Sequence, residues 1–258
     1  MGLARSFLVI VFLHVLGDFY FQTDSMAKQK GEQKRIMALH CVEYSLCILP
    51  LFLCWRPSRV SASAFFFICA THFLVDALAK PWAVQRVYRV GANDNLRVFC
   101  IDQFVHLIAC LIAGMMLVDG AASHEVMEGA LHEAIPMLLA LLIAVKPSGL
   151  FIRLLLSEYR QDSDCSKGNE AVIDDSGEQQ REGRGAGEAI GWLERVLVVV
   201  LSASSEFSAI AFVVTAKSIA RFKKIEEEPV FAETYLIGTL TSVSAAMLST
   251  LFIFWCWG

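Results

Sequence analysis

Apolar segments of about 20 residues recur along this chain of 258 residues, and they constrain its fold more than any other feature. A helix needs about 20 mostly apolar residues to cross the hydrocarbon core of a bilayer. With 56% apolar residues and a mean hydropathy of +0.54, the composition is also too apolar for an ordinary soluble domain. The sequence therefore predicts an all-α fold, a polytopic transmembrane helix bundle of about six to seven membrane segments. The segments are 5–21, 36–54, 60–79, 98–118, 134–156, 189–215 and 234–257.

The fifth segment is interrupted by Lys146-Pro147-Ser148-Gly149, and proline in a helix interior kinks or ends the helix. Lysine and arginine gather in the loops after the first, third and sixth segments, whereas the loop 119–133 has neither. If basic loops are cytoplasmic, only one of the fifth and sixth segments can cross. The interruption points to the fifth as the incomplete one.

A polar stretch over 158–188 divides the chain, with nine acidic residues, four basic residues and five glycines. Such a composition buries too little apolar surface to fold, so we expect a disordered linker there. The linker would separate an N-terminal membrane domain, 1–157, from a C-terminal two-helix membrane segment, 189–258.

Three pairs of a histidine and an aspartate interrupt the N-terminal apolar segments, where an ionisable side chain costs roughly 2.5–3.5 kcal/mol to insert. The two members of each pair are four residues apart and share one helix face. The pairs are His14 and Asp18, His72 and Asp76, and Asp102 and His106.

The position of each pair along its segment predicts that all three meet. The first and second pairs end their segments, whereas the third pair and His40 begin theirs. If the segments between them cross the membrane, all seven groups lie at similar depth in one leaflet. We therefore expect them to converge on one polar cavity beneath the basic loops.

Imidazole nitrogens and carboxylate oxygens are the ligands of zinc, manganese and non-haem iron. The six paired residues are therefore predicted ligands of a divalent metal (Zn, Mn or Fe), in one site or two adjacent sites. Two metals about 3.5–4 Å apart would suit phosphoryl or ester hydrolysis. His40, or Glu43 one turn along, would be a further ligand or the general base.

Two other interpretations remain open from the residues alone. The pairs can hydrogen-bond across a purely structural bundle, forming a membrane scaffold. Chains of histidine and aspartate also carry protons or ions in transporters.

The basic loops and a ladder of small residues predict which partners the protein binds. The basic loops would attract an anionic lipid or an isoprenyl phosphate at the bilayer surface. Gly238, Ser242 and Ala246 form a ladder of small residues that favours close helix contact, within the chain or in a homo-oligomer. No basic patch typical of nucleic-acid binding is visible in the sequence.

The motifs "HVLGDFYFQTDSMAKQK" at 14–30, "HFLVDALAK" at 72–80 and "DQFVH" at 102–106 resemble a family of bacterial and phage membrane proteins. That family is catalogued as domain of unknown function 3307. "GWLERVLVVVL", "AKSIARF" and "ETYLIGTL" extend the resemblance beyond the polar stretch. The resemblance implies a multi-pass protein of the bacterial inner (cytoplasmic) membrane and no particular activity. In placing His and Asp on neighbouring membrane helices, the chain is more loosely similar to membrane-bound metal-dependent hydrolases.

Overall fold

The fold is all-α, as predicted, and no strand occurs in the part of the chain that the computed structural model describes. That part comprises residues 2–31, 33–54, 58–79, 96–119, 130–166 and 179–258. The elements in chain order are α1 (Leu3–Val15), the π-helix η1 (Leu16–Phe21), α2 (Asp24–Gln29), α3 (Lys34–Cys54), α4 (Arg59–Leu74), the π-helix η2 (Val75–Ala79), α6 (Leu96–Asp119), α7 (Ala130–Ser166), α8 (Gln179–Ala203), α9 (Phe207–Ala220), α10 (Phe222–Glu227) and α11 (Pro229–Trp257).

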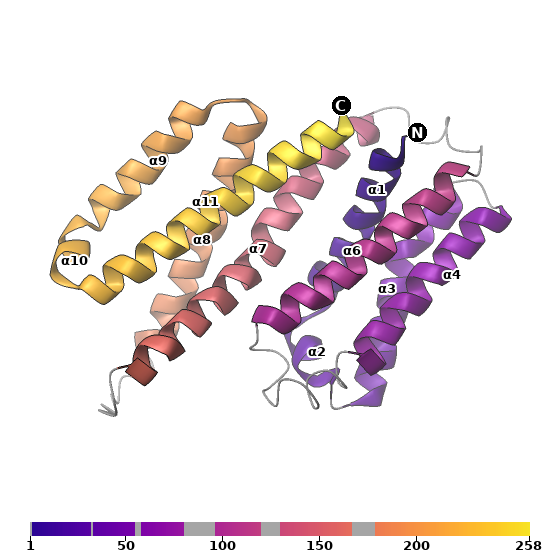
Figure 1. Cartoon of the computed structure of the whole chain (residues 1–258), viewed down its shortest axis with the longest axis horizontal. Coiled ribbons are helices and arrows are strands. Elements are labelled where there is room, and N and C mark those ends of the chain that lie inside the picture. The colour runs from indigo at the N-terminus through magenta and orange to yellow at the C-terminus, as the bar shows by residue number, and fades with distance from the viewer. Residues whose placement is uncertain (1, 32, 55–57, 80–95, 120–129, 167–178) are drawn as a thin grey trace. The chain divides into compact units, whose positions relative to one another are not determined.

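The chain forms two compact units, 1–142 with 255–258, and 143–254. In the first unit α1 packs on α6, α6 on α4, α4 on α3 and α3 on α1, which closes a four-helix bundle (Figure 1). Apolar side chains fill its interior at less than 3% exposure, as expected where facing helices interdigitate. They include Leu8, Ile10, Ile48, Ile68 and Leu117.

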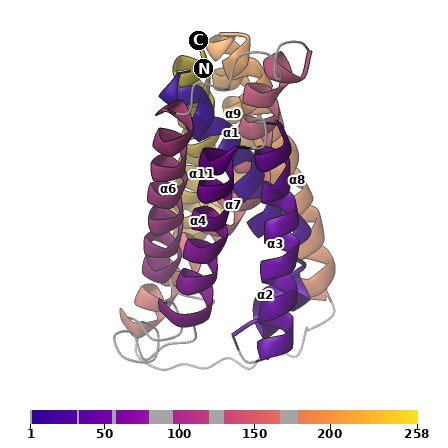
Figure 2. The ribbon, with the colours of Figure 1, turned by 90° about the vertical axis from the view of Figure 1, so that its right-hand side faces the viewer.

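Successive helices of this bundle alternate in direction, with α2 at the lower end of α3 (Figure 2). The end of α1, the start of α3, the end of α4 and the start of α6 therefore meet at one end of the bundle. These are the four places that carry the His/Asp pairs and His40. The topology thus brings together the residues that the sequence spacing predicts to converge.

In the second unit α7 runs unbroken through Lys146-Pro147-Ser148-Gly149, so the expected interruption of the fifth segment is wrong. The buried Arg195 of α8 explains how the helix is supported there. Its Nε donates to the carbonyl of Ala144 at 2.6 Å, and its Nη2 donates to that of Val145 at 3.2 Å. A neighbouring helix can stabilise backbone groups around a proline in this way.

The sixth segment is not one helix, which corrects the sequence expectation. α8 ends at Ala203 and α9 begins at Phe207, with Ser205 at a φ of 60° in the turn between them. Glu206 is exposed at the start of α9. The C-terminal region therefore contains α8, α9, α10 and α11 where the sequence predicted two helices.

Helical structure also enters both ends of the predicted linker. α7 extends to Ser166 and α8 begins at Gln179. The centre of the linker, 167–178, lies outside the described residues, so the predicted domain boundaries stay a prediction.

The small-residue ladder of α11 packs against other helices inside the second unit. A Cβ atom added at Gly238 would lie 3.3 Å from Leu156 of α7, and Ser242 and Ala246 are buried. This is the intrachain packing that the ladder allowed. Association between chains through the same face stays a prediction.

Five helical stretches in the described residues are long and apolar enough to cross a membrane: Leu3–Phe21, Arg59–Leu78, Leu96–Val118, Glu133–Tyr159 and Pro229–Trp257. The outer faces of the first bundle add to this argument, because Leu46, Phe66 and Phe104 are each more than 60% exposed. Apolar surfaces of this kind are unusual in water and ordinary against lipid. Both observations favour a membrane protein.

Candidate functional site

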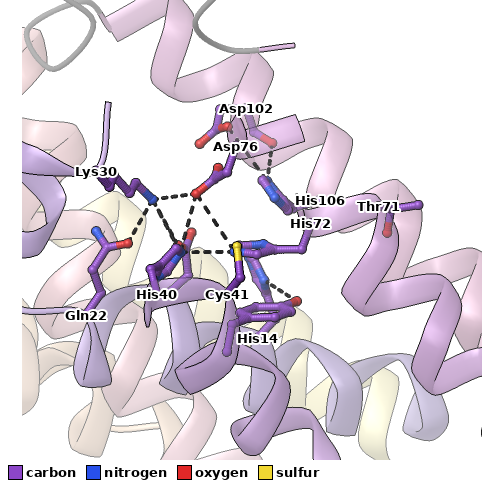
Figure 3. A network of polar contacts seen from close by, with 12 residues as sticks. His14, Gln22, Lys30, His40, Cys41, Thr71, His72, Asp76, Asp102 and His106 are labelled. Atoms are coloured by element: carbon purple, nitrogen blue, oxygen red, sulfur yellow. Dashed lines mark hydrogen bonds and ion pairs between the residues drawn. The ribbon is translucent and has the colours of Figure 1, made fainter. Parts of the chain in front are cut away.

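Seven ionisable side chains from four helices meet inside the first bundle, and none is more than 7% exposed. We call them the His/Asp cluster (Figure 3). Its members are His14, Asp18, His40, His72, Asp76, Asp102 and His106. The convergence predicted from the sequence is therefore present, in the protein interior and at one end of the bundle.

Four members of the cluster form a first group of possible metal ligands, Asp18, His40, His72 and Asp76. His40 Nε2 lies 3.1 Å from His72 Nε2 and 3.4 Å from Asp76 Oδ2. It also lies 3.5 Å from Asp18 Oδ1. A tetrahedral ion with bonds of 2.0–2.1 Å would hold its ligand atoms about 3.3 Å apart, so this spacing suits a small cation.

A second group consists of Asp76, Asp102 and His106, so Asp76 belongs to both groups. His106 Nδ1 lies 2.8 Å from the carbonyl oxygen of Asp102. A carbonyl only accepts, so Nδ1 carries the proton and Nε2 carries the lone pair. A histidine that ligates a metal is held by the same kind of bond from its other nitrogen.

Polar and aromatic neighbours fix the remaining members of the cluster. Gln103 Nε2 donates to Asp18 Oδ2 at 3.4 Å and to Asp102 Oδ2 at 3.3 Å. Tyr44 OH lies 3.1 Å from His14 Nδ1, and the Tyr44 ring stacks on His72 with centroids 3.6 Å apart. These contacts join α1, α3, α4 and α6 around the cluster.

Lys30 reaches into the cluster from the end of α2 (Figure 3). Its ammonium donates to Asp76 Oδ2 at 2.5 Å and to Gln22 Oε1 at 2.8 Å. It also lies 3.4 Å from His40 Nε2 and 3.9 Å from Asp18 Oδ1. A positive charge thus faces three ligand atoms of the first group.

Several nitrogen and oxygen atoms of the cluster are buried without a hydrogen-bond partner among the described residues. They are His14 Nε2, Asp18 Oδ1, His40 Nδ1, His72 Nδ1 and His106 Nε2. Buried polar atoms in proteins are nearly always paired with protein, water or an ion. So many in one place therefore fit a site that holds an ion or an ordered ligand.

The π-helices occur at two of the three predicted pairs. Asp18 lies in η1, just after His14, and Asp76 lies in η2, just after His72. Such wide turns are rare and are found frequently at functional sites. The backbone therefore departs from the α-helix where both carboxylates enter the cluster.

The predicted ligands and bases do not all have the same place in the structure. His40, predicted as a further ligand or a base, lies in the first ligand group, whereas His14 lies beside the groups and stacks on His106 with centroids 5.1 Å apart. Glu43 makes no hydrogen bond to the cluster among the described residues, and its Oε2 is buried without a hydrogen-bond partner. Its predicted role as a base stays a prediction.

The sequence interpretation missed Lys30 and Tyr44. The sequence places Lys30 among the basic residues that follow the first apolar segment, whereas in the structure its side chain is only 11% exposed. Tyr44 follows His40 by four residues, the spacing that marked the three pairs, and this was the available signal.

Comparison with known proteins places the cluster in a family. Residues 6–135 match the model of a family described as "Protein of unknown function (DUF3307)". The match covers half of the chain and includes every member of the His/Asp cluster, Lys30 and Tyr44. No curated protein and no solved structure matches. The chain therefore belongs to the DUF3307 family of proteins of unknown function.

Proposed function

We propose that this protein is a metal-dependent hydrolase acting on a phosphate-containing or other anionic membrane-associated substrate. The observation that carries the proposal is the convergence of three carboxylates and four imidazoles in one buried cluster. Buried ionisable groups in membrane helices are costly and usually functional. We further propose that the protein resides in the cytoplasmic membrane of a bacterium.

The donor set fits a transition metal. Carboxylate oxygen and imidazole nitrogen suit zinc, manganese and iron, and Asp76 is common to both ligand groups. A divalent metal held there would polarise a phosphoryl or carbonyl oxygen and activate water at neutral pH. The protein side chains would hold the metal, exclude bulk water and orient the substrate.

Exposed basic residues near the cluster support an anionic substrate. Lys34 and Arg35 are exposed at the start of α3, one to two turns before His40. Arg97 is exposed at the start of α6, five residues before Asp102. At a rise of 1.5 Å per residue these charges lie within about 10 Å of the cluster along each helix, which suits an anionic lipid or an isoprenyl phosphate.

Metal analysis of the full chain in detergent tests the proposal. We expect purified protein to retain close to stoichiometric zinc, manganese or iron, and to lose it in one of the variants His72→Ala and His106→Ala, which test the two ligand groups separately. Glu226→Gln, an exposed acid of α10, is the matched control and should keep the metal. Metal-loaded protein should also release phosphate from phosphatidic acid or an isoprenyl phosphate, and chelation should stop the release.

Well-folded protein that binds none of these metals would contradict the proposal. It would favour the competing interpretation, a non-enzymatic scaffold or proton path built from hydrogen bonds such as that between His40 and His72. Stoichiometric metal without hydrolysis of either lipid would retain the metal site and reject the substrate class.

A further inference from the structure

Lys30 is a basic side chain that bonds directly to the His/Asp cluster. Its side chain is 11% exposed, and its closest partner, Asp76, is 2% exposed. Burial of an ammonium among carboxylates is costly unless the charges balance one another. A role for Lys30 as a loop charge that attracts anionic lipid therefore does not explain why its ammonium is buried among carboxylates.

An ammonium group can only donate hydrogen bonds. The atoms that face Lys30 Nζ, namely Asp76 Oδ2, Gln22 Oε1 and His40 Nε2, must therefore direct lone pairs toward it. Two of these atoms are ligand atoms of the first group. A metal in that group would need the same lone pairs and would lie within about 5 Å of the ammonium charge. Lys30 and a metal thus exclude each other from the first group.

The second group differs from the first because a hydrogen bond fixes which nitrogen of its histidine carries the proton. His106 donates through Nδ1 to the carbonyl of Asp102, which leaves Nε2 as a buried nitrogen with a lone pair and no hydrogen-bond partner among the described residues. Of the other histidines of the cluster, His14 contacts the hydroxyl of Tyr44, and His40 contacts Lys30 and His72. His106 of the second group therefore offers a lone pair to a metal, and in the described part of the chain Lys30 contacts this group only through the shared Asp76.

Charge favours the same assignment. A divalent ion in the first group would lie beside the ammonium of Lys30, and like charges held close together in a buried site repel one another strongly.

We propose that the cluster is a two-cation site in which Lys30 supplies one cation and a single divalent metal, held by Asp76, Asp102 and His106, supplies the other. Asp76 bridges the two cations. This inference rests on the proposed metal function and extends it, because it fixes the number of metal ions and gives Lys30 the place that a second metal takes in dinuclear hydrolases.

The number of zinc ions bound per chain tests the assignment. The full chain in detergent is stripped with a chelator, titrated with Zn²⁺ and measured by elemental analysis. We expect about one ion in the wild type and about two in Lys30→Met, which removes the charge and keeps the apolar stem. Lys30→Arg keeps a cation and should bind about one ion, as should Lys34→Ala, an exposed lysine at the start of α3. Lys30→Met can be purified with Zn²⁺ present, since the metal would replace the lost charge.

Two zinc ions in the wild type, or one in Lys30→Met, would overturn the Lys30 assignment and leave a metal site in place. No zinc in any variant would instead reject the proposed metal function. In the wild-type background, the single ion should be lost in His106→Ala and retained in His72→Ala. The reverse pattern would place the metal in the first group and contradict the assignment.

Discussion

Asp76→Asn is expected to abolish metal binding, because Asp76 is the one carboxylate common to both ligand groups. Replacing residues that merely support a metal ligand lowers affinity by about 10- to 100-fold. Loss of a shared ligand should therefore exceed about 100-fold, whichever group holds the ion. The affinity is measured by titrating the chelator-stripped protein with Zn²⁺ in competition with a chromophoric chelator.

The same substitution should destabilise the metal-free protein. Lys30 would lose the charge of its nearest partner, at 2.5 Å, while its ammonium stays largely buried. A hydrogen bond to a charged group contributes about 1.5–3 kcal/mol, so a loss of that order in the free energy of unfolding is expected. Asp24→Asn, on the exposed surface of α2, is the matched control and should change neither quantity. Unchanged zinc affinity in Asp76→Asn would show that the His/Asp cluster is not the metal site.

The convergence of the cluster was predictable because helix geometry is regular. A spacing of four residues places two side chains on one face, and alternation of helix direction places the end of one helix beside the start of the next. The end of α1 with its pair, His14 and Asp18, and the start of α6 with Asp102 and His106 therefore lie at one end of the bundle, as the sequence predicts (Figure 2).

The assignment of ligands within the cluster was not predictable from spacing. The spacing of four residues predicts that His14 stays with Asp18 as His72 stays with Asp76. In the structure Asp18 and Asp76 both lie in π-helices, η1 and η2, and only the second pair shares a ligand group. Asp18 is instead grouped with His40, which comes from a different helix.

The burial of Lys30 depends on a tertiary contact that no local pattern shows. Lysines in a stretch such as "AKQKGEQKR" are ordinarily solvated, and Lys34 is indeed exposed. Lys30 differs because α2 packs on α3 and directs its side chain toward Asp76. The same reasoning applies to Pro147, since the support from Arg195 across α7 and α8 outweighs the local tendency of proline to break a helix.

Gly17→Ala is expected to destabilise the bundle at the contact between η1 and α3. A Cβ atom at Gly17 would lie 2.9 Å from Cδ2 of Tyr44 and 3.4 Å from Cβ of Cys47. Tyr44 is only 1% exposed, so its ring has little free space into which to move. Forcing an extra methyl group into a packed interior costs about 1–3 kcal/mol, which should appear as a lower melting temperature in detergent.

Gly31→Ala is the matched control, because no atom lies within 4 Å of a Cβ placed there. Gly17→Ala should also weaken zinc binding, since displacement of Tyr44 disturbs its contact with His14, whose ring stacks on His106. A general loss of packing would lower stability alone, whereas the contacts of Tyr44 predict that zinc affinity falls with it. If Gly17→Ala were as stable as Gly31→Ala and bound zinc equally well, Tyr44 could not be what positions the imidazoles of the cluster.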